Sequence, residues 1–336
     1  MAVRHGHPAL IERMTNAVEQ PKASPDQTDP GAPAAQGAQL RFDRLTREWV
    51  VIAADRQQRP NLPTTECPFC PGGLEAPTEY TVRTFPNRWP PLQRGAPIDL
   101  EGANEAAASG AAEIVLYSPD HHASLASIGA GGVRRVIDVW AERTEELLKR
   151  PEVEYVLVFE NRGEEAGATI PHPHGQIYGF PFVPPVPARE MAVAAKHGCP
   201  VCAEQDDESL GARLIATDDD ALGYARAAAG WPYEVLVAPR RHVAGLVDLG
   251  EQERDALAGV LGEVLERYER LFDEPLPYML WIHPGVHLHI HLVTPLRAPR
   301  VRRYVAAGEL GSGVMFNPVS PETAAAQLTA DREEGS

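Results

Sequence analysis

An internal repetition constrains the fold of this chain more than any other feature of its sequence. Each copy begins with a Cys-x-x-Cys pair and continues through an apolar strand, a histidine and an amphipathic helix. A second strand and a His-x-His segment close each copy, at His172 and His174 first and at His287 to His291 later. Chance recurrence of these features in one order is improbable, so the sequence predicts two copies of one α+β module.

The expected organisation follows from this repeat and from the composition near the ends of the chain. Residues 1–38 are rich in Ala, Pro, Gln and Asp with little periodicity, which predicts a disordered N-terminal segment. The first module is assigned to residues 39–190 and the second to residues 191–330. A short tail at 331–336 follows the second module.

Hydrophobic periodicity and turn residues place the elements within each module. Apolar residues at helical spacing predict amphipathic helices over residues 133–148 and 257–271. A capping box of Asp248 and Glu251 is expected to open the second helix. The expected strands are a hairpin over 41–52 and single strands at 82–85, 113–117, 153–159, 234–238, 278–282 and 287–293.

Composition excludes several classes of protein. The net charge of −16 argues against a general surface for nucleic acid or anionic membranes, so a bound anion must meet local positive charge or amides. No apolar run approaches the roughly 20 residues of a membrane span, and the N-terminus lacks the apolar core of a signal peptide. A cytoplasmic enzyme is therefore expected, in which paired cysteines are metal ligands or redox motifs rather than disulfides.

The two cysteine pairs have the spacing of zinc ligands. Cys67 and Cys70 lie in a Gly/Pro-rich turn with no helix pattern after it, which favours a zinc knuckle over a redox motif. Each module also supplies histidines at turns or strand ends, and Cys and His together suit zinc. The proposed first site is Cys67, Cys70, His121 and His172, with His122 as an alternative to His121; the second is Cys199, Cys202, His242 and His287.

The His-Pro-His-Gly-Gln segment from His172 to Gln176 is the candidate catalytic segment. Its prolines disfavour a helix, and an extended chain sends both imidazoles to one face. With His172 assigned to metal, His174 remains as the nucleophile, and Gly175 would let a bulky anion approach the backbone. Gln176, on the same face, could donate a hydrogen bond to a phosphoryl oxygen. A surface loop with two incidental histidines is the alternative, which the second His-x-His arrangement disfavours.

Several motifs together carry a resemblance to a known family. They are Phe159-Glu160-Asn161-Arg162-Gly163, His172-Pro173-His174-Gly175-Gln176, the Cys67 pair, Ser118-Pro119-Asp120-His121 and Trp231-Pro232-Tyr233-Glu234. Between Arg41 and Leu328 the chain is similar to the galactose-1-phosphate uridylyltransferase family, a tandem branch of the histidine-triad superfamily. The resemblance implies an α+β fold in which two histidine-triad-like modules form a mixed, largely antiparallel sheet with flanking helices.

The same resemblance implies a reaction and its site residues. UDP-glucose would uridylylate His174 and release glucose 1-phosphate, and galactose 1-phosphate would then take the UMP to give UDP-galactose. Members of the family are usually homodimers with sites near the subunit interface, and no nucleic acid or membrane partner is implied. Gln176 would hold the phosphoryl group; Asn161 and Thr169 fall at phosphate contacts, and Arg41 and Asn87 fall near nucleotide-binding positions.

The resemblance leaves two ligand sets open for the second metal. Some members hold it with a Glu and three His, which match Glu190, His283, His289 and His291, while others use a second Cys pair. Soft thiolates outcompete an oxygen-rich site for zinc, which favours zinc at the Cys199 set. Two zinc ions are therefore expected, one in each module, with iron or partial occupancy as alternatives at the second.

Other interpretations accompany the uridylyltransferase. Residues 308–321 lack the Gln-bearing stretch that contacts the hexose phosphate in well-known members, and they resemble the branch with sugar-nucleotide phosphorylases. A phosphorylase or hydrolase is thus the first alternative, with His289 as a rival nucleophile, although Gln176 favours a transferase. A non-catalytic zinc adaptor is the second alternative. An arginine cluster near the C-terminus consists of Arg297, Arg300, Arg302 and Arg303. These side chains could simply be solvated, or they could bind the hexose phosphate.

Overall fold

The computed structural model describes residues 37–54, 66–272 and 274–330. The predicted disordered segment therefore lies outside the described residues except at positions 37 and 38, and the predicted tail lies wholly outside them. Residues from Gly37 onward group into one unit, within which both expected modules contribute to one sheet. The predicted module boundary at 190/191 falls inside helix α3 (Pro185–His197) and stays a prediction.

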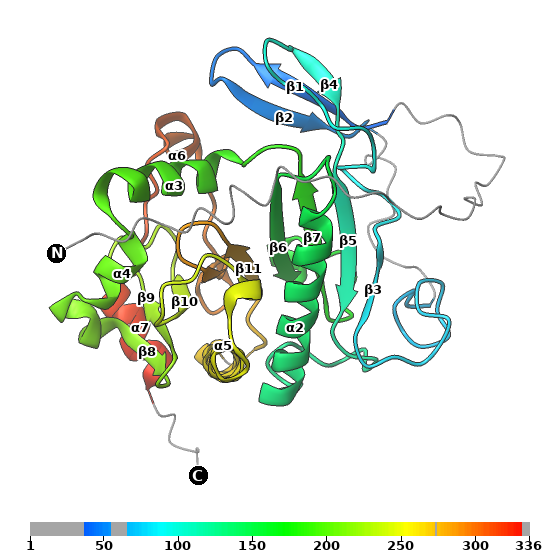
Figure 1. The fold of residues 1–336 in the computed structure, drawn as a ribbon. Coiled ribbons are helices and arrows are strands. Elements are labelled where there is room, and N and C mark those ends of the chain that lie inside the picture. Colours follow the sequence, from blue (N-terminus) through cyan, green and yellow to red (C-terminus); the bar gives the residue numbers. More distant parts are fainter. Residues whose placement is uncertain (1–36, 55–65, 273, 331–336) are drawn as a thin grey trace. The chain divides into compact units, whose positions relative to one another are not determined.

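A nine-stranded sheet forms the centre of this unit (Figure 1). All of its strand pairs are antiparallel, and the one parallel pairing among the described residues is an isolated bridge between Gln93 and Ser109. The α+β class with a largely antiparallel sheet is confirmed. The strand order is β3 (Arg83–Pro86), β5 (Ala111–Leu116), β7 (His174–Phe180), β6 (Tyr155–Arg162), β11 (Tyr278–His283), β12 (His289–Val293), β10 (Val235–Pro239), β9 (Ala221–Ala225) and β8 (Leu214–Thr217).

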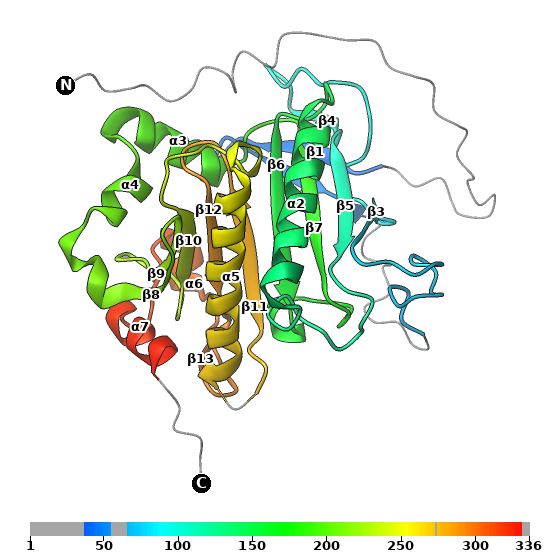
Figure 2. The same ribbon diagram turned by 60° about the horizontal axis from the view of Figure 1, so that its bottom comes forward.

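The two halves of this sheet correspond to each other about the pair β6 and β11. Outward from this pair, the first half runs β7, β5 and β3, and the second runs β12, β10 and β9. β6 and β11 are antiparallel, with Arg162 opposite Tyr278. Helices α2 (Gly129–Leu148) and α5 (Glu251–Leu271) pack side by side over the sheet (Figure 2). The repeat in the sequence therefore produces a pseudo-two-fold arrangement of both strands and helices.

The two long helices bury the faces that their apolar spacing predicts. Burying one Val, Leu or Ile side chain contributes about 1.5–3 kcal/mol, so this helix layer is a large part of the core. The buried apolar residues are Val133, Val136, Ile137, Trp140 and Leu147 on α2, and Leu257, Val260, Leu261, Val264, Leu265 and Tyr268 on α5.

The start of α5 differs from the prediction. Its N-cap is Gly250, whose amide donates to the Glu253 carboxylate at 2.8 Å. Asp248 belongs instead to a preceding 3-10 turn, Leu246–Asp248, and cannot cap the helix. The expected capping box of Asp248 and Glu251 is therefore wrong by two residues.

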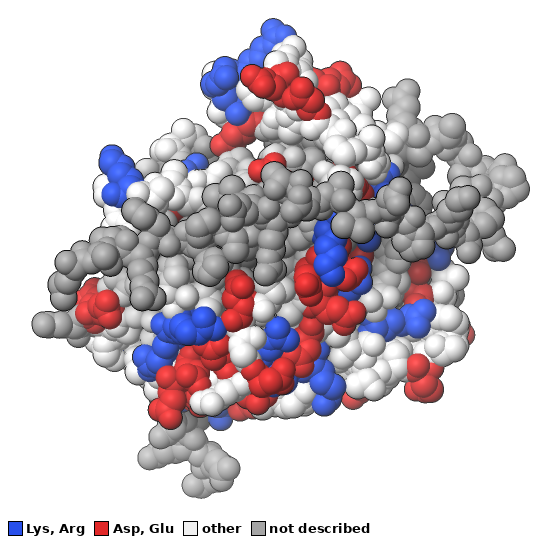
Figure 3. All heavy atoms as spheres, viewed as in Figure 1, with Lys and Arg blue, Asp and Glu red and all other residues white. Residues whose placement is uncertain are grey.

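An ion-pair network joins the two long helices. Arg134 of α2 lies 3.1 Å from Asp138 on its own helix and 2.5 Å from Glu251 of α5, and it also contacts Asp255. Arg254 of α5 lies 3.1 Å from Asp138. Figure 3 shows that Lys and Arg side chains are interspersed with Asp and Glu on this face of the molecule. Exposed ion pairs are individually worth little, so burial holds the helices together and the charges add specificity.

The remaining elements surround the large sheet. The predicted hairpin is confirmed and forms a small sheet with a third strand, and three helices begin with proline, which is favoured at the first helical position. No helix in the described part of the chain has the length and apolar character needed to cross a membrane. The elements around the large sheet are β1 (Gln39–Asp43), β2 (Glu48–Ile52), β4 (Glu105–Ala107), α4 (Pro200–Gln205), β13 (Leu296–Ala298), β14 (Val301–Arg302), α6 (Ala307–Ser312) and α7 (Pro321–Thr329).

Candidate active site and metal centres

His174 is the first residue of β7, which lies between β5 and β6 in the large sheet. Its side chain is buried, and its Nδ1 lies 2.8 Å from the carbonyl oxygen of His172. When Nδ1 donates to this carbonyl, the ring lone pair is on Nε2, which is then the nucleophilic atom. Phe69 from the cysteine turn packs edge-on against the ring, with the centroids 5.1 Å apart. The first cysteine turn therefore touches the candidate nucleophile directly.

A small cavity opens beside His174. Its lining includes His172 and His174 together with Asn161 near the end of β6. Gln176 follows two residues after His174 on β7, which places both side chains on the same face of the strand. The structure therefore brings Asn161 to the nucleophile, where its amide could donate to a phosphoryl oxygen.

The other predicted substrate contacts are more dispersed. Thr169 lies in the segment before β7, next in sequence to residues that line the cavity. Asn87 follows β3 and is buried. Arg41 belongs to β1 of the small sheet, where it lies 3.9 Å from Glu105. Their roles in substrate binding remain predictions.

The first cysteine pair meets two histidines. The ligand atoms of Cys67, Cys70, His121 and His172 lie within 4.8 Å of one another. The Cys70 sulfur is 3.5 Å from His121 Nδ1 and 3.6 Å from His172 Nδ1. Zinc bonds of about 2.3 Å to sulfur and about 2.0–2.1 Å to nitrogen put the two ligand atoms about 3.6 Å apart in a tetrahedron. This cluster therefore fits tetrahedral zinc, and it contains His121 rather than the alternative His122.

Tyr80 and a backbone carbonyl fix the His172 ring. His172 Nε2 lies 2.8 Å from the Ser118 carbonyl oxygen and 2.8 Å from the Tyr80 hydroxyl, so Nδ1 is the atom that faces the cysteines. Outer partners of this kind set the tautomer and orientation of a ligating histidine. Tyr80 was not predicted as a site residue, because a single aromatic residue between motifs carries no pattern.

The second cysteine pair forms a similar cluster. The ligand atoms of Cys199, Cys202, His242 and His287 also lie within 4.8 Å of one another. The Cys202 sulfur is 3.3 Å from His242 Nδ1 and 3.4 Å from His287 Nδ1. Burial and the adjacent Cys199 sulfur raise the pKa of Cys202 to about 12, so a thiolate here needs a bound cation. This donor set again fits zinc.

A third cluster, formed by a glutamate of α3 and three histidines of the second half, shares no ligand with the other two. Glu190 of α3 and the histidines His283, His289 and His291 have ligand atoms within 4.8 Å of one another. Glu190 lies 2.9 Å from His283 Nδ1 and 3.7 Å from His289 Nε2. Burial lowers the pKa of His289 to about 3 and that of His291 to about 4, so both rings are neutral, as ligation requires. The Cys199 set and the Glu190 set were predicted as alternatives for one second metal, but the fold assembles both.

Strand register shows which residues of the first half occupy the positions that correspond to the third cluster. Phe159 lies opposite Gln176 in the first half, and Trp281 lies opposite His291 in the second. His291 is therefore the counterpart of Gln176, and His289 is the counterpart of the candidate nucleophile. Because the rival nucleophile lies inside a cluster with a carboxylate, the geometry favours catalysis in the first half.

Glu160 of β6 lies opposite Leu280 of β11 and carries a buried carboxyl group. The Tyr278 hydroxyl donates to it at 3.0 Å. Burial raises its pKa to about 8, although the Tyr278 hydrogen bond and the Arg162 charge oppose this shift. In the unfolded chain the pKa is about 4.3, so the unfolded state loses its proton first and the free energy of unfolding falls as pH rises from about 5 to about 8.

We expect Glu160→Gln to remove most of this pH dependence, because the amide stays neutral in both states. Urea unfolding of both proteins between pH 5 and pH 8 measures the two slopes. Equal slopes in the two proteins would contradict the assignment of a neutral, buried Glu160.

Gly175 makes room for Tyr117. A Cβ atom at Gly175 would lie 2.0 Å from the Tyr117 hydroxyl oxygen and 3.1 Å from the Phe159 carbonyl oxygen. The expectation that this glycine lets an anion approach the backbone is therefore wrong, since a protein side chain already fills the space.

Gly175→Ala is expected to lower the free energy of unfolding by about 1–3 kcal/mol through overpacking. Adding Tyr117→Phe should recover part of this loss, because the clashing hydroxyl is removed. Urea unfolding of both single variants and the double variant measures the coupling. Strictly additive effects would show that the two residues do not compete for this space.

Three of the four C-terminal arginines pair with carboxylates. Arg303 also stacks over the Trp231 ring, with its guanidinium carbon 4.3 Å from the ring centroid. The cluster is thus largely neutralised, which gives little support to a hexose phosphate site built from these arginines. The pairs are Arg300 with Glu274, Arg302 with Glu165, and Arg303 with Glu309.

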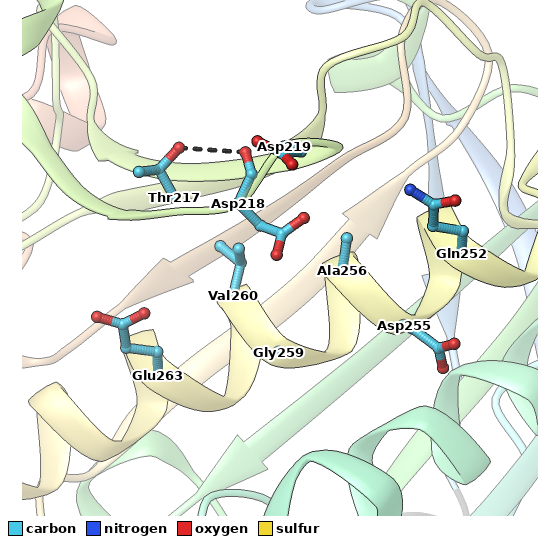
Figure 4. A pocket seen from close by; sticks show the side chains of 9 residues that line it. All are labelled: Thr217, Asp218, Asp219, Gln252, Asp255, Ala256, Gly259, Val260 and Glu263. Atoms are coloured by element: carbon cyan, nitrogen blue, oxygen red, sulfur yellow. Dashed lines mark hydrogen bonds between the residues drawn. The ribbon is translucent and has the colours of Figure 1, made fainter.

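A larger cleft lies between the β8–β9 turn and α5 (Figure 4). Its lining includes none of the predicted site residues, and acidic side chains repel phosphate-bearing substrates. The cavity beside His174 is therefore the better substrate site. The acidic residues in the lining of the cleft are Asp218, Asp219, Asp255 and Glu263.

The sheet of two repeated halves, the His-Pro-His-Gly-Gln segment and the cysteine–histidine clusters define a two-module α+β protein with a candidate site for nucleotidyl transfer. Models for the N-terminal and C-terminal domains of galactose-1-phosphate uridyl transferase match residues 32–184 and 203–332. The chain belongs to the galactose-1-phosphate uridylyltransferase family. The resemblance found in the sequence motifs is thereby confirmed.

Relatives and solved structures agree with this assignment. The galactose-1-phosphate uridylyltransferase of Thermotoga maritima is 36% identical, covering 86% of this chain and 97% of that protein. The Rattus norvegicus enzyme is 30% identical, covering 88% of each chain. A solved uridylyltransferase structure superposes with a TM-score of 0.78 at 28% identity, covering 87% of this chain and 97% of that one. An ADP-glucose phosphorylase from Arabidopsis thaliana gives 0.68 at 25% identity, covering 88% of this chain and 99% of that one.

Proposed function

We propose that this chain moves UMP from UDP-glucose to galactose 1-phosphate by double displacement at His174. The observation that carries the proposal is the orientation of His174, whose Nδ1 faces a backbone carbonyl in a cavity that Asn161 also lines. Nε2 then carries the lone pair that attacks phosphorus. Family membership supports the choice of substrates.

In the first step, Nε2 of His174 attacks the α-phosphorus of UDP-glucose. A phosphorus–nitrogen bond forms as the bond to the bridging oxygen breaks, and glucose 1-phosphate leaves with that electron pair. In the second step, a phosphate oxygen of galactose 1-phosphate attacks the same phosphorus, the phosphorus–nitrogen bond breaks and UDP-galactose forms. Gln176 and Asn161 donate hydrogen bonds to the phosphoryl oxygens as charge develops, Thr169 contacts the phosphates, and Arg41 and Asn87 bind the nucleotide.

The proposed cofactors are metal ions at the three clusters. The Cys67 and Cys199 sets each supply four protein ligands, which closes the zinc shell and makes both sites structural. The first of these holds His172, and thereby the backbone carbonyl that orients His174. The Glu190 set combines a carboxylate with imidazoles, which suits zinc or iron.

A cytoplasmic location and a homodimer complete the proposal. Membership of the galactose-1-phosphate uridylyltransferase family supports both. Chromatography with light scattering would measure the oligomeric state directly.

A second candidate is a sugar-nucleotide phosphorylase. The similarity to the Arabidopsis thaliana ADP-glucose phosphorylase over nearly all of that chain favours it. In that reaction, inorganic phosphate would take the nucleotidyl group from His174 in place of galactose 1-phosphate.

Product analysis with UDP-glucose radiolabelled in the α-phosphate separates these functions. We expect labelled UDP-galactose when galactose 1-phosphate is the acceptor. Labelled UDP formed only with inorganic phosphate would identify a phosphorylase, and labelled UMP formed in water alone would identify a hydrolase.

A further inference from the structure

Glu234 contacts the third cluster without being one of its four ligands. It lies directly before β10 and is 4% exposed, and its Oε1 is 3.4 Å from His291 Nδ1. The His291 ring is also buried and stacks on Trp281, with centroids 4.7 Å apart and an interplanar angle of 12°. The ring therefore cannot turn freely, and its Nδ1 edge faces a carboxylate.

Glu234 is itself held in place on both carboxylate oxygens. Its Oε2 accepts hydrogen bonds from the amides of Gly230 at 2.8 Å and Trp231 at 3.2 Å. Arg226 donates to Oε1 at 3.2 Å. These contacts hold the carboxylate in a fixed position beside His291.

We infer that Glu234 is a positioning residue that accepts Nδ1–H of His291 and leaves Nε2 as the ligand atom for the third cluster. His289, on the same strand, shows the same use of an outer acceptor, since its Nδ1 lies 2.7 Å from the His287 carbonyl oxygen. A carboxylate behind an imidazole ligand fixes its tautomer and raises its basicity. This inference rests on the proposal that the Glu190 cluster binds a metal.

The test uses Mn²⁺ as the probe, because carboxylate and imidazole ligands accept it while the thiolate sites prefer zinc. Full-length protein with its cysteine sites loaded with zinc is titrated with Mn²⁺, and free Mn²⁺ is followed by its electron paramagnetic resonance signal. We expect wild-type protein to bind one Mn²⁺ per chain and Glu234→Gln to bind it about 10–100-fold more weakly.

Glu113→Gln is the matched control. Glu113 is also a buried carboxylate, and it lies 2.8 Å from Arg143, but it belongs to β5 in the first half of the sheet. Its variant should bind Mn²⁺ as tightly as wild type. If Glu234→Gln does not fold, Glu234→Asp serves instead, because it keeps the charge and withdraws the carboxylate by one methylene.

The outcomes separate the inference from the proposed function. Wild-type affinity in Glu234→Gln, or in Glu234→Asp where that variant is used, overturns the positioning role while the metal site stands. No binding by wild type overturns the third metal site and this inference together, although labelling of His174 can still succeed. A further readout is the rise in thermal midpoint caused by Mn²⁺, which should shrink in the variant. An undiminished rise would contradict the inference.

Discussion

Replacing His174 with Ala is expected to lower kcat by on the order of 10⁵-fold, as for loss of a covalent nucleophile, and to abolish the uridylylated enzyme. The imidazole forms and then releases the bond to phosphorus, so without it one hexose phosphate would have to displace the other directly. UDP-galactose formation measures the first effect. Mass spectrometry of protein quenched in alkali, which preserves phosphoramidates, measures the second.

Two histidine variants are controls for this result. His122 is exposed and lies outside all three clusters, so His122→Ala should keep full activity. His289→Ala should still form the adduct, since His289 is the counterpart of His174 in the other half. An adduct that survives in His174→Ala but disappears in His289→Ala would move the active site to the second half.

Cys70→Ser is expected to remove about one zinc ion per chain and to lower the thermal midpoint by about 10 °C. A serine hydroxyl is a poor zinc ligand, so the variant loses the bound ion. The other three ligands are then no longer joined through zinc. The zinc content and the thermal midpoint are measured on the same samples, by elemental mass spectrometry and calorimetry. Unchanged zinc content would contradict the proposed site.

Cys202→Ser is the matched substitution in the other half. It should also remove about one zinc ion per chain, since each closed site holds one ion. The adduct at His174 should persist in this variant, because the Cys202 cluster adjoins the strand of His289 rather than that of His174. Loss of the adduct in Cys202→Ser alone would reverse the assignment of the catalytic half.

Most of the central sheet and the two long helices could be predicted because local periodicity determines them, whereas strands β8 and β9 at one end of the sheet were not predicted. Apolar spacing along α2 and α5 shows which face is buried, and the repeated motif order shows that two similar halves exist. Helices α3 and α4 were not predicted, although each begins with proline at its first position. Their few buried residues leave little apolar pattern in the sequence, so tertiary packing determines them.

The metal clusters were predictable to the extent that short motifs fix their ligands. A Cys-x-x-Cys turn brings two sulfurs together, and alternation along a strand puts His289 and His291 on one face. His287 lies before β12 and joins a different cluster from these two, which spacing alone cannot reveal. Glu190 reaches its histidines only through the path of α3, a long-range effect. Likewise, the space next to Gly175 is filled by Tyr117 from a neighbouring segment, and the local sequence does not reveal this contact.

Cutting this chain between its halves would leave β6 and β11 as bare strand edges. Unpaired backbone amides and carbonyls on such an edge favour pairing with another copy. Because the two strands meet antiparallel at the pseudo-two-fold axis, a single half could restore the same contact by symmetric self-association. Because the two halves are covalently joined in this chain, the contact between them is permanent. One half can then lose its catalytic function while the other half retains it.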